Sequence, residues 1–217
     1  MKTRINYFAV MACIPALIFY TICLGQTQPA TPSDFAVVNR TVSISNGQDG
    51  SPVIHLDERD GDGVAWIKGK AFAQGAIEFN LRGKDVLQRS FVGIAFHGVN
   101  DTTYEVIYFR PFNFQSPDTL RKKHTVQYIS EPDYPWDRLR KEHPLVYEST
   151  VIPMPLAAGW FHAHIVVEKD EIVVYVNHSK VPSLKVKKLN NRNDGMIGLW
   201  NDALKGDFAN LEIREDR

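Results

Sequence analysis

Apolar and polar residues alternate along several stretches of this 217-residue chain, and this alternation limits the folds that it can adopt. Ile77, Phe79 and Leu81 alternate with polar residues, and the same period of two runs through 161–167 and 172–177. Successive side chains of a β-strand point to opposite faces, so these stretches predict strands with one face in a core.

Clusters of Gly, Asp and Asn at 46–50, 60–63, 98–101 and 190–195 have the composition of turns between such strands. A single helix of about two turns is expected from Trp136 to His143, between Pro135 and Pro144. About a dozen short strands with this spacing are typical of a β-sandwich. The predicted fold is therefore all-β, a two-sheet antiparallel jelly-roll sandwich formed by one domain over residues 35–217.

The first 25 residues have the composition of a secretory signal peptide. Lys2 and Arg4 precede an apolar run from Phe8 to Leu24, and small residues precede Gln26, where cleavage is expected. A retained membrane anchor is the alternative, but Pro15 interrupts the run and no positively charged flank follows it. Residues 26–34 are rich in Pro, Thr and Gln and predict a short tether.

Cleavage there would give a mature chain with neither of the two cysteines, Cys13 and Cys23, and therefore no disulfide. Without Lys2 and Arg4, 23 basic and 25 acidic residues leave a net charge of −2. The chain has no run of basic residues that could bind along a phosphate backbone, which argues against nucleic acid as a partner. We expect a monomer with no membrane span in the mature chain, secreted, periplasmic or attached to the cell surface.

Three stretches carry a resemblance to a known superfamily. They are GAIEFNLRG with SFVGIAFHG (75–98), YEVIYFRPFNF with VQYIS (104–130), and the carboxy-terminal set HAHIVVE, IVVYVN, PSLKV, GMIGLW and GDFANLEI. Together they resemble the concanavalin A-like lectin/glucanase superfamily in its laminin-G-like branch. The chain is also similar to secreted proteins of polysaccharide-degrading bacteria and, more distantly, to 3-keto-disaccharide hydrolase (DUF1080-type) domains. The resemblance implies a glycan or polysaccharide as partner.

The glucanases of that superfamily carry two glutamates in an ExDxxE pattern, about 5 Å apart across the scissile bond. Neither Glu78 nor Glu105 has a partner acid at that spacing, and Glu168 to Glu171 is typical of a turn between strands. The chain therefore departs from the glucanase pattern.

The segment from Tyr104 to Tyr147 combines aromatic rings with Arg, Glu, Asn and Gln. Sugar recognition needs planar rings against C–H faces and bidentate polar groups for paired hydroxyls. The ligand-binding residues predicted on this basis are His97, Glu105, Arg110, Asn113, Gln127, Tyr128, Tyr134, Trp136 and Arg140. The alternative is that the rings pack in the sandwich and the charged residues form ordinary ion pairs.

The strand Ser90 to His97 predicts a shallow trough. Gly93 and Ala95 would share one face, with His97 at the end of the trough and Glu105, Arg110 and Gln127 beside it. Gly93 could equally relieve crowding between sheets, and a register slip of one residue would turn the neighbours away.

The segments 115–124 and 130–144 are long for connections in a sandwich, and the second would form a rim carrying Tyr134 and Trp136. The acidic stretch 57–63 is predicted to be a solvated turn because it fails the EF-hand pattern. No cofactor is expected, and calcium in that stretch is the alternative. His162 and His164 share a strand face without an evident third metal ligand.

Three functions are compatible with these features. The first is an exported, lectin-like carbohydrate-binding domain. The second is a hydrolase or lyase with Glu105 and His97 as acid/base groups and Arg110 orienting the substrate. The third is a structural or adhesion domain.

Overall fold

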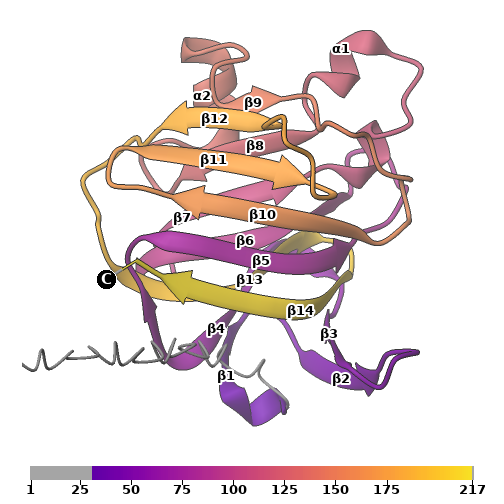
Figure 1. The fold of residues 1–217 in the computed structure, drawn as a ribbon, viewed down its shortest axis with the longest axis vertical. Helices are drawn as coiled ribbons and strands as arrows, with labels where there is room; N and C mark the ends of the chain where they lie inside the picture. Colours follow the sequence, from indigo (N-terminus) through magenta and orange to yellow (C-terminus); the bar gives the residue numbers. More distant parts are fainter. Residues whose placement is uncertain (1–30, 217) are drawn as a thin grey trace, which may run out of the picture.

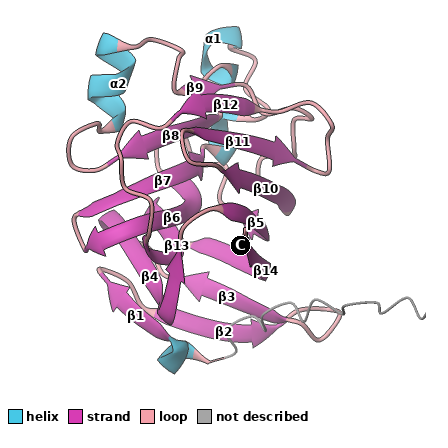
Figure 2. Ribbon diagram, turned by 60° about the vertical axis from the view of Figure 1, so that its left-hand side comes forward, coloured by secondary structure: helices cyan, strands magenta, loops and turns pink. Residues whose placement is uncertain are grey.

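The computed structural model describes residues 31–216 as two seven-stranded antiparallel sheets packed face to face (Figures 1 and 2). In spatial order, sheet A holds β1 (Phe35–Val38), β4 (Arg59–Phe72), β13 (Gly195–Ala203), β6 (Ser90–Asn100), β7 (Thr103–Phe109), β8 (Val126–Ser130) and β9 (Glu148–Ser149). Sheet B holds β12 (Leu184–Lys187), β11 (Glu171–Val176), β10 (Phe161–Val167), β5 (Gly75–Arg82), β14 (Gly206–Glu215), β3 (Pro52–Leu56) and β2 (Val42–Asn46). The predicted jelly-roll sandwich is confirmed.

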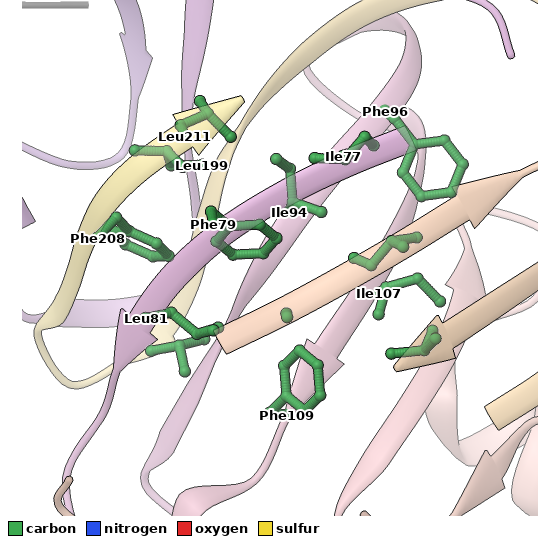
Figure 3. Close-up of a cluster of buried hydrophobic side chains, with 14 of the residues drawn as sticks. Ile77, Phe79, Leu81, Ile94, Phe96, Ile107, Phe109, Leu199, Phe208 and Leu211 are labelled. Atoms are coloured by element: carbon green, nitrogen blue, oxygen red, sulfur yellow. The ribbon is translucent and has the colours of Figure 1, made fainter. Parts of the chain in front are cut away.

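Alternating side chains of both sheets fill the space between them. Ile77, Phe79 and Leu81 of β5 are completely buried, and the alternation predicted for β5 and β10 is present residue by residue. Figure 3 shows the labelled side chains of β5, β6, β7, β13 and β14 gathered in this core. Burial of these apolar side chains is the main favourable term for a domain of this size.

A second apolar cluster lies on the face of sheet A that points away from sheet B. It consists of Val64, Trp66, Ala95, Tyr104, Val106, Tyr108, Ile129, Leu139 and Trp200. Leu139 belongs to the helix α2 (Trp136–Glu142), which packs beside β8 and matches the helix predicted there. The outer face of sheet A is therefore partly apolar and is covered at one side by α2 (Figure 2).

Three connections differ from the sequence-based expectations. The segment 115–124 contains a short helix, α1 (Thr119–Lys122), which begins where Asp118 caps two backbone N–H groups. A 3-10 turn, η2 (Pro111–Asn113), follows β7. The end of the predicted tether forms another 3-10 turn, η1 (Pro32–Asp34), while the predicted signal peptide and residues 26–30 lie outside the described residues.

The prediction of a turn at 57–63 is wrong for most of that stretch, because β4 begins at Arg59. Asp62 pairs with Asp202 of β13 on one side. On the other side, the Asn39 amide donates to the carbonyl oxygens of Asp60 (3.0 Å) and Asp62 (2.8 Å). These long-range hydrogen bonds override the local preference of Asp and Gly for turns.

Candidate functional site

A pocket of about 530 Å³ opens on the outer face of sheet A. It crosses the neighbouring strands β4, β13, β6, β7 and β8, and residues of η2, α1 and α2 complete its rim. Its lining consists of Asp62, Leu87, Gln88, Phe91, Tyr108, Arg110, Phe112, Asn113, Arg121, His124, Ile129, Glu131, Trp136, Arg140, Trp200 and Asp202. The volume suits a ligand of about one or two sugar rings.

Aromatic rings form the floor of the pocket. Trp200 and Tyr108 both pair with Gly93, one from each side, and their ring centroids lie 5.2 Å apart. Phe91 lies 6.0 Å from Tyr108 and 5.4 Å from Phe112, edge to face in both cases. Edge-to-face and tilted contacts of this kind stabilise the rings and make the floor of the pocket largely apolar.

The structure gives a reason for Gly93. A Cβ atom at this position would lie 2.1 Å from the carbonyl oxygen of Ile107 and 2.7 Å from the Cα atom of Tyr108. Glycine therefore relieves crowding between neighbouring strands of one sheet. The trough expected over Gly93 and Ala95 is flanked by Tyr108 and Trp200, which pair with Gly93 on either side.

Basic side chains form one wall. The Arg110 guanidinium, 4% exposed, donates to the Tyr108 hydroxyl at 2.5 Å and to the Gln127 side-chain carbonyl. Gln127 also accepts a hydrogen bond of 2.9 Å from the Tyr108 hydroxyl, so these three side chains lie on the same face of sheet A. The neighbouring Arg140 stacks on the Trp136 ring, 5.2 Å from its centroid.

The carboxylate of Glu148 on β9 offsets part of the positive charge of this basic wall. Arg140 donates two hydrogen bonds to its carboxylate (3.1 and 2.8 Å), His124 lies at 2.7 Å and Arg110 at 3.6 Å. Burial alone would raise the pKa of Glu148, but the hydrogen bonds from Arg140, the close approach of His124 and the nearby positive charges lower it overall.

Three carboxylic acids form the opposite wall. Asp62 and Asp202 are cross-strand partners, and Glu131 directly follows β8. Asp62 is open to the solvent of the pocket, but the protein around it limits its hydration and, together with repulsion from Asp202, raises its pKa to about 6. Loss of water and the charge of Asp62 raise the pKa of Glu131 to about 7. Burial likewise raises the pKa of Asp202.

Asn113 of η2 contributes an acceptor without a partner. Its side chain is 5% exposed and its amide nitrogen donates to the carbonyl oxygen of His124 at 3.2 Å. Its Oδ1 atom is buried and has no hydrogen-bond partner among the described residues. An unpaired buried acceptor costs free energy, which a donor on a ligand would recover.

His97, Glu105 and Tyr128 lie on the other side of sheet A and do not line the pocket. Glu105 is completely buried, 2.8 Å from Nδ1 of His97, and accepts a short hydrogen bond from the Tyr128 hydroxyl. Lys188 and Arg192, from the connection between β12 and β13, approach the same carboxylate at 4.0 and 3.9 Å. The expected grouping of Glu105 and His97 with Arg110 is therefore not found.

The position of His97 has a local cause. Its φ is 49°, and the pairing of β6 with β7 shifts register between Phe96 and Asn100. Such a bulge breaks the simple alternation of faces. His97 consequently stacks on the core residue Phe72 at 6.0 Å.

The predicted rim is present in part. Trp136 is 50% exposed and lines the pocket. Tyr134 is half-buried, lies under the guanidinium of Arg138 at 4.9 Å and does not line the pocket. Of the nine predicted residues, four line the pocket: Arg110, Asn113, Trp136 and Arg140. Gln127 is not part of the lining but accepts a hydrogen bond from Arg110.

Sequence reasoning missed Asp62, Glu131, Trp200 and Asp202. Trp200 and Asp202 have a signal in the sequence, since residues two apart on one strand share a face. For Asp62, the Gly residues on both sides of it favour a turn instead. Its pairing with Asp202 depends on strands about 140 residues apart, which local patterns do not specify.

Among residues 31–216, no helix is long and apolar enough to cross a membrane. The same part of the chain contains no group of three or more His, Cys, Asp or Glu residues arranged to hold a metal ion. His162 instead stacks on His178 with 4.1 Å between ring centroids, and His164 lies beside Tyr175.

No protein-family model and no curated protein sequence matches this chain. Solved structures do match its fold. The carbohydrate-binding module CBM66 from Bacillus subtilis aligns with a TM-score of 0.57 and 14% identity over 82% of this chain and 93% of that one. A protein of unknown function with a galectin-like fold from Bacillus subtilis has a TM-score of 0.55 and 12% identity, over 83% and 89% of the two chains.

An endo-glucanase of glycoside hydrolase family 16 from Bacteroides ovatus aligns with a TM-score of 0.52 and 14% identity over 79% of this chain and 84% of that one. The fold is therefore a two-sheet jelly roll like those of these proteins. At these identities the likeness concerns the fold alone. Membership of the laminin-G-like branch or of the 3-keto-disaccharide hydrolases stays a prediction.

Proposed function

We propose that this protein binds a glycan in the pocket on the outer face of sheet A. The observation that carries the proposal is the combination of Phe91, Tyr108, Phe112, Trp136 and Trp200 with charged side chains around one pocket. Aromatic faces cover the C–H faces of sugar rings, while carboxylates, guanidiniums and amides bond paired hydroxyl groups. Both kinds of group line the same cavity, as sugar recognition requires.

Two further considerations support the proposal. The solved structures with this fold include one described as a carbohydrate-binding module and one described as an endo-glucanase. The predicted signal peptide, with cleavage before Gln26, would direct the protein to export. Export would bring the domain into contact with extracellular polysaccharide. Monomeric state and location outside the cytoplasm are part of the proposal.

Affinity electrophoresis through gels that contain single polysaccharides tests the proposal. Trp136→Ala removes a half-exposed ring from the pocket, and we expect at least a tenfold loss of retention. Trp160→Ala is the matched control, because Trp160 is 41% exposed, lies under Arg82 at 4.7 Å and is absent from the pocket lining. Equal retention of both variants, or no retention of the wild-type protein on any polysaccharide, would refute the proposal.

A second candidate function is cleavage of a glycan in the same pocket. The observation that favours it is the pair Asp62 and Glu131, whose raised pKa values allow one carboxyl group to hold a proton while the other is ionised near neutral pH. The dyad first considered, Glu105 with His97, is sealed in the core.

Release of reducing sugar from mixed polysaccharides separates the two functions. If the protein cleaves glycans, Asp62→Asn and Glu131→Gln should each lower product release by about 100-fold or more. Glu105→Gln should leave the turnover of folded protein unchanged. Retention without product release would leave binding as the function.

A further inference from the structure

The two charged walls of the pocket differ in whether the protein itself balances their charge. On the basic wall, Arg140, His124 and Arg110 all surround the carboxylate of Glu148, at 2.8, 2.7 and 3.6 Å. Arg121, at the rim, lies 3.6 Å from Asp118. One carboxylate thus offsets part of the positive charge of this wall before any ligand arrives.

The acidic wall has no such balance. Within residues 31–216, none of Asp62, Glu131 and Asp202 forms a salt bridge. The groups that face Asp62 are Asp202 on β13 and the Tyr104 hydroxyl on β7, which donates to its carboxylate at 3.4 Å.

The positive charge of Arg40 acts on Asp62 and Asp202, but its guanidinium forms no salt bridge with either carboxylate. Its guanidinium donates to the Asn201 side chain at 2.7 Å and to the backbone carbonyl oxygens of Asn39 and Gly61, both at 2.5 Å. Among the described residues, the charged groups that act on Glu131 are further acids, Asp62 and Asp137 of α2. Within this part of the chain, the acidic wall therefore carries negative charge that no salt bridge neutralises and that Arg40 offsets only from a distance.

An independent observation also indicates a donor-rich ligand. Asn113 lines the same pocket, and its buried Oδ1 atom has no hydrogen-bond partner among the described residues. Like the three carboxylates, it is a hydrogen-bond acceptor. A protonated amine supplies three donors and one positive charge, and a sugar hydroxyl supplies a further donor for the amide.

We propose that the pocket selects an amino sugar, with the protonated amine against Asp62, Glu131 and Asp202 and the sugar ring on the aromatic floor. This inference rests on the proposed glycan binding and specifies its ligand class. The ammonium group would gain charge-assisted hydrogen bonds on the acidic wall and an attractive contact with the face of Trp200. The arginines of the opposite wall, which already contact Glu148, would bond the hydroxyl groups of the adjoining ring.

Three tetrasaccharides test the selection by isothermal titration calorimetry at pH 7 and low salt. They are β-1,4-linked glucosamine, N-acetylglucosamine and glucose tetramers, which differ at the second carbon by an amine, an acetamide and a hydroxyl. We expect the glucosamine tetramer to bind at least tenfold more tightly than the other two. Part of this preference should disappear in 1 M salt, because salt screens partly exposed charges.

Variants assign the preference to the acidic wall. The double variant Asp62→Asn, Glu131→Gln keeps the shape of both side chains and should abolish the preference for the glucosamine tetramer. Glu168→Gln, at an exposed position between β10 and β11, removes a charge outside the pocket and should keep the preference. Thermal melts verify that each variant is folded.

Equal affinity for the three tetramers would overturn the inference, as would a preference that survives the double variant. Either result leaves the proposed glycan binding intact if another polysaccharide still retards the protein through Trp136. Loss of all glycan retention would instead refute the proposed function itself.

Discussion

At the scale of single residues, Glu105 shows how a buried charge is tolerated. Burial alone would raise its pKa, but hydrogen bonds from His97 and Tyr128 and the charges of His97 and Lys188 lower it overall. The carboxylate thus ties β7 to β6, β8 and the connection after β12. Its role in the structure is packing of charged groups rather than contact with a ligand.

Glu105→Gln should lower the free energy of unfolding by about 3–5 kcal/mol, because it leaves the buried Lys188 and the partly buried Arg192 without their carboxylate. Because the folded pKa lies below the ordinary value of 4.5, the stabilisation is complete above pH 4.5 and is lost as the pH falls through the folded pKa. Urea unfolding at pH 7 and below pH 4 measures both effects. An unchanged midpoint at pH 7 would contradict this role.

Gly93→Ala should destabilise the protein by about 1–3 kcal/mol, since the added methyl group would collide with the backbone of β7. The collision should also move Tyr108 relative to Trp200 and so weaken glycan retention. Chemical denaturation and affinity gels of the same preparation measure the two consequences. Unchanged stability would show that β7 can move away from the added methyl group without a loss of folding free energy.

At the scale of secondary structure elements, β9 holds the rim of the pocket in place although it is only two residues long. Its Glu148 connects α2, through Arg140, to the end of β7 and to the segment after α1. The position of Trp136 therefore depends on a carboxylate that lies outside the pocket lining.

Glu148→Gln should destabilise the protein by up to about 3 kcal/mol, because Arg110 and Arg140 would then face each other without a negative charge between them. Amide hydrogen exchange in α2 should accelerate. Glu142→Gln is the control within the same helix, since its exposed pair with Arg138 contributes only about 0.3–0.5 kcal/mol. Similar exchange in both variants would exclude β9 as the anchor of α2.

The sequence predicted those elements whose pattern is local. The alternation in β5 and β10 and the prolines around α2 specify strand faces and helix bounds without reference to the rest of the chain. The sequence did not predict the extent of β4 or the face of sheet A to which the His97 side chain points. Both depend on the pairing of whole strands. The candidate site was predicted in part for the same reason, since Arg110 and Arg140 lie near each other in sequence while Asp62 and Asp202 do not.

At the scale of the whole molecule, the acidic wall should oppose stability at higher pH. Asp62 and Glu131 have folded pKa values of about 6 and about 7, above their ordinary values of 3.8 and 4.5. Protons therefore bind more tightly to the folded state, and this contribution is complete below pH 4 and is lost as the pH rises to about 7.

Asp62→Asn should consequently raise the melting temperature at pH 8 and have little effect at pH 4. The gain should be below about 1 kcal/mol, because Asp62 is exposed to solvent in the pocket and water screens its charge. Melts of the wild-type and variant proteins across this pH range measure the difference. A variant that is less stable at pH 8 would show that Asp62 stabilises the fold.

The pocket opens on sheet A and not on sheet B, which matters when the protein is attached to a solid support. The strands β10, β11 and β12 of sheet B contribute no residue to the pocket lining. A carrier coupled through Lys185, whose side chain is 60% exposed on β12, would therefore hold the domain with its pocket directed outward. Domains attached in this orientation could form a dense layer in which every binding site still faces the solution.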